Sequence, residues 1–401
     1  MQREYFYSCA KDLEPYLERE LLDFFGSDVR MFASSGGFTI KTTFDKAVHF
    51  SIMTKVASRF FIKLGVIGYR QEKEIYKEAQ KEIQRNNWKH YFLENDRIKI
   101  NTIFDPVVKT KIKSPLFCSQ ILKDALVDNI QGIKGDPKNS NFDLLQRIEW
   151  HRKKECFFSI IYIDFYRRSL GNRGYKNEIS HIAPLKESLA ASILMSTKWD
   201  QEKYLYDPMC GSGTFLIEAL LQKYNIAGQI FHMCECKKKE RPFFPIRRLR
   251  QFTEKPETIQ ETLKFELDKY EHMKQHSEEC LILGTDIFMD NIKELKLLLK
   301  KLGLNKLIYV DQKDFFETSP YNESGTIVFN PPYGERLNRI DNLQDFYHDI
   351  GEHLKNSFKD HHAYILMGDN EIRKSISLQT SSRTAFLNGK IECRLIGYKL
   401  F

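Results

Sequence analysis

Residues 204–221, which read YLYDPMCGSGTFLIEALL, decide the fold of this 401-residue chain. The apolar triplet 204–206 predicts a short strand, and residues 215–221 have the composition and period of a helix. A glycine-containing turn joins them, so the segment predicts the first crossover of an open, doubly wound, mostly parallel α/β sheet. Ligands bind such sheets beyond the strand ends, where Gly211 and Gly213 would let the backbone approach closely and the helix N-terminus offers free N–H groups.

The turn differs from two common nucleotide-binding loops. A G-x-G-x-x-G fingerprint would need a glycine at Leu216, and a P-loop would need Gly-Lys followed by Ser or Thr. What remains is D-P-x-C-G-S-G-T over residues 207–214. No histidine or other base is adjacent to Cys210 in the sequence, which favours a packing role for this thiol over nucleophilic catalysis.

A second loop, Asn330-Pro331-Pro332-Tyr333, follows the apolar, β-branched run 326–329. The side-chain oxygen of Asn330 and a carbonyl near the prolines would accept the two N–H bonds of an exocyclic amine. Prolines have no N–H to compete for those carbonyls, and Tyr333 would stack on a flat base. This chemistry suits methyl transfer to a base nitrogen. The alternative is a proline-rich turn that ends a buried strand.

Two further predicted strands end in acids. The run 280–285 leads to Asp286, whose carboxylate can accept hydrogen bonds from the hydroxyls of a ribose. The run 307–310 leads to Asp311 and then to Asp314, which precedes Phe315. Acids at such positions are usually helix caps, and that is the competing interpretation.

Length and composition predict a large intracellular protein. A chain of 401 residues with 42% hydrophobic content should form two or three domains. No apolar run is long enough for a membrane helix, and the first residues lack the apolar region of a signal peptide. Eight scattered cysteines favour reduced thiols. Cys234-x-Cys236 has no second pair, so no metal is expected, and the predicted location is the cytoplasm.

The net charge of +8 is concentrated in places, most clearly in residues 237–250, which read KKKERPFFPIRRLR. Cations interleaved with aromatic rings suit a polyanion with exposed bases, such as RNA. A solvated loop over the sheet is the alternative. The next segment has Ile259, Leu263, Leu267 and Tyr270 at helical spacing, which predicts a core-facing helix, and the role of residues 231–280 as a whole stays open.

The first part of the chain predicts a separate α+β unit. Strands are expected at 5–9, 97–101 and 156–164, and helices at 13–25 and 115–130. Six residues of the second helix are expected to face inward: Phe117, Ile121, Leu122, Ala125, Leu126 and Ile130.

The octet 207–214, taken with residues 330–333, resembles the motifs of class I S-adenosylmethionine-dependent methyltransferases. The resemblance implies S-adenosylmethionine as the cofactor, with Asp286 at its ribose and Asp314 with Phe315 at its adenine. The cofactor-binding residues that it implies are Asp207, Cys210, Gly211, Gly213, Thr214, Asp286, Asp314, Phe315 and Asn330. The catalytic residues that it implies are Asn330, Pro331, Pro332 and Tyr333.

The N-terminal part resembles a ferredoxin-like segment followed by a THUMP domain, an RNA-binding module of tRNA and rRNA modification enzymes. Residues 113–128 look like the signature helix of that domain. The resemblance implies three domains: a ferredoxin-like segment at 1–45, a THUMP domain at 46–165 and a methyltransferase domain at 166–401. Lys111, Lys113 and Lys123 are expected to meet RNA phosphates, or else to form solvated surface.

Residues 169–176, 183–191, 207–219, 330–337 and 388–395 resemble the RlmL-type 23S rRNA guanine-N2 methyltransferases, with Gly389-Lys390-Ile391 as the one departure. This implies methylation of the N2 amine of a guanosine in RNA, with 23S rRNA or a large-subunit assembly intermediate as the favoured partner. Arg173, Glu335 and Arg336 would contact that RNA. A single modification is expected, because a second methyltransferase domain of some relatives is absent. The alternatives are adenine-N6 methylation of DNA and a non-catalytic rRNA-binding assembly factor.

Overall fold

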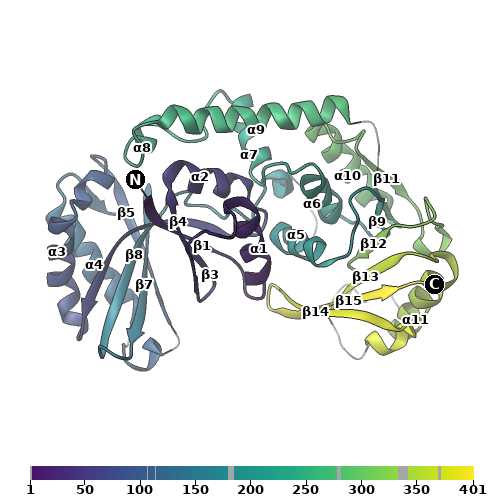
Figure 1. Ribbon diagram of the computed structural model, residues 1–401, viewed down its shortest axis with the longest axis horizontal. Helices are drawn as coiled ribbons and strands as arrows, with labels where there is room; N and C mark the ends of the chain where they lie inside the picture. The colour runs from purple at the N-terminus through teal and green to yellow at the C-terminus, as the bar shows by residue number, and fades with distance from the viewer. Residues whose placement is uncertain are drawn as a thin grey trace.

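Two β-sheets, one in each half of the chain, organise the molecule (Figure 1). The structure is a computed structural model, and it describes residues 2–105, 107–112, 114–178, 185–277, 281–332, 342–368 and 372–401. We call residues 2–164 the N-terminal unit and residues 187–401 the C-terminal unit. Among the described residues, no helix is both long enough and apolar enough to cross a membrane.

The C-terminal sheet has the strand order β11-β10-β9-β12-β13-β15-β14. Its strands are β9 (Leu205–Asp207), β10 (Ile282–Asp286), β11 (Ile308–Gln312), β12 (Thr326–Phe329), β13 (His362–Met367), β14 (Thr380–Asn388) and β15 (Ile391–Lys399). The five strands from β11 to β13 are parallel, and β15 runs antiparallel to both of its neighbours. The chain moves outward from β9 to β11 and then returns to β12 on the other side of β9, which makes the β9–β12 pair the switch point of the sheet. The predicted doubly wound, mostly parallel sheet is confirmed.

Helices cover both faces of this sheet: α5 (Glu187–Ser196), α6 (Thr214–Lys223), α10 (Met289–Leu302) and α11 (Leu343–Ser357). Successive residues of each central strand therefore enter different cores. Leu205 and Val328 join the cluster that contains α5, α6 and α10, whereas Tyr206 and Ile327 join the cluster that contains α11. Burial on both faces explains why these strands are continuous apolar runs.

The N-terminal sheet has the order β2-β3-β1-β4-β8-β7-β5-β6. Its strands are β1 (Gln2–Ser8), β2 (Met31–Ser34), β3 (Gly37–Thr43), β4 (Arg59–Tyr69), β5 (Arg97–Phe104), β6 (Lys134–Gly135), β7 (Phe142–His151) and β8 (Cys156–Asp164), and its helices are α1 (Glu14–Phe25), α2 (Phe44–Met53), α3 (Ile75–Arg85) and α4 (Pro115–Asn129). Strands from both sides of the predicted boundary at residue 45 lie in this one sheet, since Tyr5 of β1 pairs with Ile62 of β4. The domain boundaries stay a prediction.

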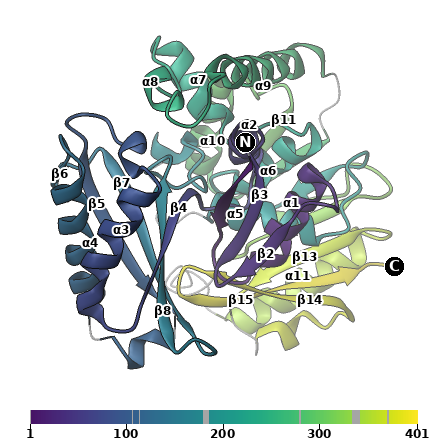
Figure 2. The same cartoon turned by 60° about the vertical axis from the view of Figure 1, so that its left-hand side comes forward.

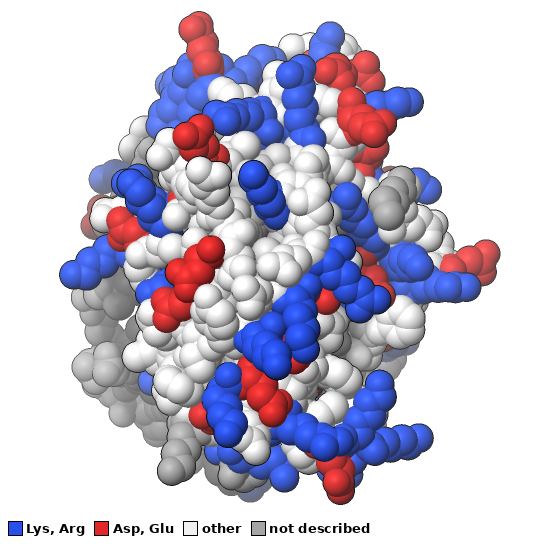
Figure 3. Space-filling view, turned by 90° about the vertical axis from the view of Figure 1, so that its left-hand side faces the viewer, with Lys and Arg blue, Asp and Glu red and all other residues white. Residues whose placement is uncertain are grey.

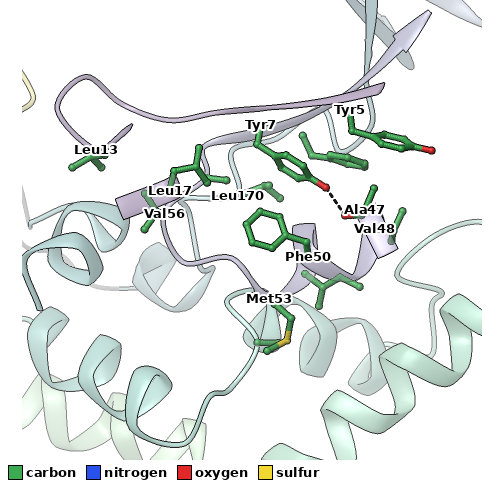
Figure 4. Close-up of a cluster of buried hydrophobic side chains, with 14 of the residues drawn as sticks. Tyr5, Tyr7, Leu13, Leu17, Ala47, Val48, Phe50, Met53, Val56 and Leu170 are labelled. Carbon is green, nitrogen blue, oxygen red and sulfur yellow. Dashed lines mark hydrogen bonds between the residues drawn. The ribbon is translucent and has the colours of Figure 1, made fainter. Parts of the chain in front are cut away.

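The core of the N-terminal unit is continuous with that of the C-terminal unit. Figure 4 shows its central part, where Leu17 of α1 and Phe50 of α2 pack under Tyr7, whose hydroxyl donates to the carbonyl of Ala47 at 2.7 Å. Leu170, from the segment between the units, lies in the same group of side chains. The buried apolar cluster that begins with Tyr5 also contains residues of α6 and β12.

Residues 230–276, a part of the C-terminal unit that we call the strap, reach across to the N-terminal unit. It consists of α7 (Ile230–Lys238), α8 (Ile246–Leu249) and α9 (Pro256–His276), and α9 lies along one side of the molecule from the N-terminal sheet to α10 (Figures 1 and 2). Ile259, Leu263 and Tyr270 are buried, as their helical spacing predicts. The carboxylate of Asp96 accepts two hydrogen bonds from Arg248, whose guanidinium also lies over the ring of Phe142.

One prediction for α4 is wrong. Phe117 does not face inward, because half of its side chain is exposed, and Leu116 before it is 78% exposed. The buried stripe instead runs through Cys118, Leu122 and Ala125. Phe117 precedes Cys118 by one residue and so lies about 100° around the helix from Cys118, beyond the edge of that stripe.

Candidate active site

The turn after β9 has the backbone that its glycines predict. Gly211 has a φ of +49°, and Gly213, which caps α6, has a φ of +71°. A Cβ at Gly213 would lie 2.5 Å from the Leu295 side chain, whereas a Cβ at Gly211 would meet nothing within 4 Å. The space above Gly211 is therefore open, and the turn leaves room there for a ligand that approaches the backbone.

Asp286, at the end of β10, holds this turn in place. One carboxylate oxygen accepts the backbone N–H of Gly211 at 2.9 Å, and the other accepts the N–H of Phe288 at 2.9 Å and the Asn291 amide at 3.0 Å. A buried carboxylate needs such donors. Sequence reasoning missed Asn291, because an asparagine in the first turn of a helix gives no sign that it donates to an acid five residues earlier. The ribose contact of Asp286 stays a prediction.

A second buried acid, Asp207, lies at the end of β9 and is 2% exposed. Burial raises the pKa of its carboxyl well above the ordinary value, the N–H of Met209 at 3.1 Å lowers it, and nearby Asp286 raises it further. Within the described residues, no Lys or Arg forms an ion pair with either carboxylate. Two buried acids beside an open glycine turn suit a ligand that carries positive charge.

Cys210 and Thr214 line the floor of the same turn and are buried. Burial raises the pKa of the Cys210 thiol well above its usual range, which keeps the sulfur protonated and poorly nucleophilic. The Cys210 side chain packs against Gly284, where a Cβ would come within 3.1 Å of it. This contact agrees with the predicted packing role.

The Asn330 loop lies beside this turn, because β12 pairs with β9 in parallel and Ile327 is opposite Tyr206. Both strands end at the same edge of the sheet, so residues 207–213 and residues 330–332 are neighbours at that edge. The side-chain oxygen Oδ1 of Asn330 is buried and has no hydrogen-bond partner among the described residues. An unpaired buried acceptor costs about 1–3 kcal/mol, so this oxygen is suited to a donor that a ligand brings. Tyr333 lies outside the described residues.

Three exposed apolar residues follow Asp286 directly. Ile287, Phe288 and Met289 are 53%, 49% and 43% exposed. Apolar side chains that remain exposed beside an open ligand turn suit the face of a flat ring. Sequence reasoning missed this feature, although three apolar residues after an acid at a strand end were a visible signal.

Asp314 and Phe315 follow β11. The Asp314 carboxylate accepts the N–H of Phe316 at 3.0 Å and so caps a short helical turn. Phe315 is 3% exposed and packs against Phe329 and His353. Burial leaves little of this ring for a ligand, and the adenine contact of the pair stays a prediction.

The predicted RNA contact of Arg173 is wrong. Its side chain is fully buried, and its guanidinium is bonded to Glu218 and to two backbone carbonyls, so it cannot meet a phosphate. Lys111 is exposed and lies over the Trp150 ring at 4.2 Å, and Lys123 is partly exposed and close to Asp124. Lys113, Glu335 and Arg336 lie outside the described residues.

The basic run 237–250 is divided between two roles. Arg248 and Phe244 are used within the fold, since Arg248 pairs with Asp96 and Phe244 packs on Phe165 and Tyr166. Lys237, Lys238, Arg247 and Arg250 are exposed. Within the described ranges, no group of three or more His, Cys, Asp or Glu side chains could hold a metal ion.

Comparison with known proteins gives one family match, to the RMKL-like methyltransferase domain (UPF0020), over residues 173–396. A protein of Synechocystis sp. with the provisional name of an RNA methyltransferase is 28% identical over the whole chain and 97% of its own length. The ribosomal RNA large subunit methyltransferases K/L of Psychromonas ingrahamii and Methylococcus capsulatus are 27% and 28% identical over 99% and 98% of this chain. The chain spans about half the length of these two relatives, 50% and 51%.

Solved structures show the same fold. A possible methylase from Clostridium difficile has a TM-score of 0.81 at 22% identity, over 100% of this chain and 99% of its own. A predicted N6-adenine-specific DNA methylase from Listeria monocytogenes has a TM-score of 0.79 at 22% identity, over 100% of this chain and 97% of its own. A third structure, with a TM-score of 0.78 at 20% identity and a coverage of 100% and 98%, contains SAH.

Proposed function

Because the chain belongs to the UPF0020 family of RMKL-like methyltransferase domains, which use S-adenosylmethionine, we propose that it methylates the exocyclic N2 amine of a guanosine in RNA, with 23S rRNA as the target. One observation carries this proposal. The parallel pair β9–β12 brings the open turn at Gly211 and the unpaired oxygen of Asn330 to one edge of the sheet. A methyl donor and an amine acceptor need to meet at such an edge.

The residues around Gly211 fit the methyl donor. S-adenosylmethionine carries its methyl group on a positively charged sulfonium. This charge would lie close to the buried acids Asp207 and Asp286, which have no cationic partner among the described residues. Gly211 leaves room for the donor against the backbone, and the N-terminus of α6 presents free N–H groups to its carboxylate. The apolar wall of Ile287 and Phe288 suits the donor's adenine.

The residues around Asn330 fit the acceptor. Oδ1 of Asn330 would accept one N–H of the guanine amine, and a carbonyl near Pro331 would accept the other. With both hydrogens held, the nitrogen lone pair is aimed at the methyl carbon. The new nitrogen–carbon bond forms as the sulfur–carbon bond breaks, its electron pair stays on sulfur, and the amine proton leaves to solvent. Positioning and electrostatics supply the acceleration, because the donor is already activated.

Two observations support RNA as the substrate. The K/L relatives are named as ribosomal RNA methyltransferases. The outer face of the N-terminal unit carries many Lys and Arg side chains, with smaller groups of Asp and Glu between them (Figure 3). We assign RNA binding to this unit, with a ferredoxin-like segment at 1–45, a THUMP domain at 46–165 and Lys111 and Lys123 among its phosphate contacts. A guanosine in folded RNA would be flipped out to reach the edge of the catalytic sheet.

Adenine-N6 methylation of DNA is the second candidate, because an Asn-Pro-Pro-Tyr loop can hold any exocyclic amine, and one structural neighbour carries that description. Incubation of the protein with labelled S-adenosylmethionine and with RNA or DNA of matched sequence separates the two. The proposal expects N2-methylguanosine in the RNA by mass spectrometry of nucleosides. Incorporation into DNA alone, as N6-methyladenine, would replace the proposal with its rival.

A further inference from the structure

The turn Asn172-Arg173-Gly174-Tyr175 has no part in the proposed site, yet the Arg173 side chain in it is hydrogen-bonded to both units. The Nε and Nη2 atoms of Arg173 each donate to a different carboxylate oxygen of Glu218 at 3.1 Å. Nη1 donates to the Leu170 carbonyl at 2.9 Å, and Nη2 also donates to the Lys55 carbonyl at 2.5 Å. The side chain is fully buried, so its whole fork of donors is used inside the protein.

These three partners belong to three different parts of the molecule. Glu218 is on α6, one helical turn after Thr214, which ends the glycine turn at the active site. Lys55 follows α2 in the N-terminal unit. Leu170 lies in the segment that joins the units. One guanidinium therefore connects the helix that carries the active-site turn to the N-terminal unit.

A second set of bonds fixes the same joint. The last carbonyls of a helix have no partner within it, and at α2 two of them are capped from the C-terminal unit. The N–H of Gly228 donates to Met53 at 3.2 Å, and that of Gln229 donates to Ile52 at 3.0 Å. The contact is close, because a Cβ at Gly228 would lie 2.2 Å from the Thr54 carbonyl oxygen.

Buried charges surround this joint. Lys55 and Glu218, both buried, accompany Arg173, and Lys176 lies 3.7 Å from Glu187 beside them. Glu20 of α1 accepts the N–H of Lys55 at 2.8 Å. Lys55 is 6% exposed, and this burial lowers the pKa of its ammonium.

Stability alone is a weak reason for such a cluster. A buried ion pair is often no more stabilising than well-packed apolar residues of the same size. What a bidentate arginine adds is a fixed geometry between the groups that it joins. The cluster therefore fits a need for an exact spacing between the units better than a need for stability.

We propose that Arg173 is a positioning residue, which fixes the spacing between RNA held by the N-terminal unit and the methyl donor, and thereby selects the guanosine that is methylated. This inference rests on the proposed function. The N-terminal unit holds the RNA at one end, α6 holds the donor turn at the other, and Arg173 ties the two. A looser joint lets neighbouring guanosines reach the donor.

The test maps methyl groups on large-subunit rRNA purified from a strain that lacks this protein. The wild-type protein should place its methyl groups on a single nucleotide. Arg173→Lys keeps a positive charge near Glu218 but cannot serve all three acceptors. It should lower the rate at the wild-type nucleotide by roughly 100-fold, as a small misplacement does, and should move a measurable share of the methyl groups to nearby guanosines.

A double variant separates positioning from stability. Arg173→Met with Glu218→Met removes both buried charges, so the thermal stability lost in Arg173→Lys should be largely regained. The bonds to Leu170 and Lys55 stay absent, so methyl groups should still spread. The matched control is Arg59→Met, which breaks the ion pair with Asp164 at 2.6 Å, a pair whose two members both lie within the N-terminal unit. It should leave the position of the methyl group unchanged.

The outcomes distinguish the two proposals. If the wild-type protein places no methyl group on the RNA, the proposed function fails. If the wild-type protein methylates one nucleotide, and both Arg173 variants methylate that same nucleotide alone at a lower rate, the positioning role is overturned and Arg173 serves stability only.

Discussion

The carboxylate of Asp286 accepts the backbone N–H of Gly211 at 2.9 Å, so the acid that ends one strand fixes the loop that follows its neighbour. β10 and β9 are adjacent and parallel, which brings the two ends together. The same carboxylate is expected to face the donor's ribose. If that contact exists, donor binding and loop geometry depend on one side chain.

Replacement of Asp286 by Asn should weaken donor binding by about tenfold or more, because hydrogen bonds to a charged acceptor are worth roughly 1.5–3 kcal/mol. Isothermal titration calorimetry with S-adenosylmethionine measures this. Asn291→Leu removes a single donor to Asp286 and serves as the graded comparison, with a smaller loss of affinity. Equal affinities for all three proteins would show that Asp286 does not shape the donor site.

The two glycines of the turn should respond differently to alanine. Gly213→Ala places a Cβ 2.5 Å from Leu295 and should lower the melting temperature clearly. Gly211→Ala meets no atom within 4 Å, so its effect on stability is limited to the left-handed backbone, about 1–2 kcal/mol. Its Cβ fills the proposed donor space, so donor binding should be lost. Differential scanning fluorimetry and calorimetry on both variants check this, and normal donor affinity in Gly211→Ala would place the donor elsewhere.

The buried carboxyl of Asp207 predicts a pH dependence. Burial raises its folded-state pKa, so the stability that it contributes is present below the unfolded pKa and is lost as the pH rises through the folded pKa. Asp207→Asn keeps the acceptor for Met209 but cannot ionise. The variant should therefore become more stable than the wild type as the pH rises from 5 to 8, while binding the cationic donor less well. Melting curves of both proteins, measured at several pH values across that range, test this prediction. A difference in stability that does not change with pH would contradict it.

Asn330→Ala should separate catalysis from donor binding. Removal of one positioned hydrogen-bond partner commonly costs about 100-fold or more in kcat. The donor turn follows a different strand, so the Kd for S-adenosylmethionine should change little. Single-turnover methyl transfer and calorimetry on the same preparation give both numbers. A variant that methylates RNA at the wild-type rate would remove Asn330 from the site.

Lys111→Ala and Lys123→Ala should weaken RNA binding without a change in donor affinity. Each lost phosphate contact should lower the slope of log affinity against log salt by about 1. Filter binding from low to high salt measures the slope. An exposed lysine away from this unit, Lys355, provides the control and should leave the slope unchanged.

The strand, turn and helix at 204–221 could be predicted because period, glycine placement and apolar runs are local signals. The strand at 326–329 could be predicted from its apolar, β-branched composition as well. The role of Arg173 could not be predicted, since arginine is almost never fully buried unless it is paired. Its partner, Glu218, is 45 positions away in the sequence and appears there as an ordinary helical glutamate.

Two other features depended on tertiary context. Phe117 is strongly apolar, yet it is half exposed, because α4 turns a different side toward its sheet. Apolar residues lie on several sides of this helix, so the sequence does not show which side is buried. The strap residue Arg248 looked like part of a nucleic-acid patch, because its partner Asp96 lies 152 positions earlier. A run of charged residues in the sequence does not show which of them are exposed and which form ion pairs between the two units.

The continuous apolar cluster that begins at Tyr5 and reaches β12 limits how this protein can be divided into separate domains. If the chain were cut between residues 164 and 187 and the fragments separated, each fragment would expose to water the apolar side chains that are buried in the shared core. We therefore expect that the N-terminal unit cannot be moved alone onto another enzyme. Chimaeras should exchange both halves together, or redesign the surface where they meet.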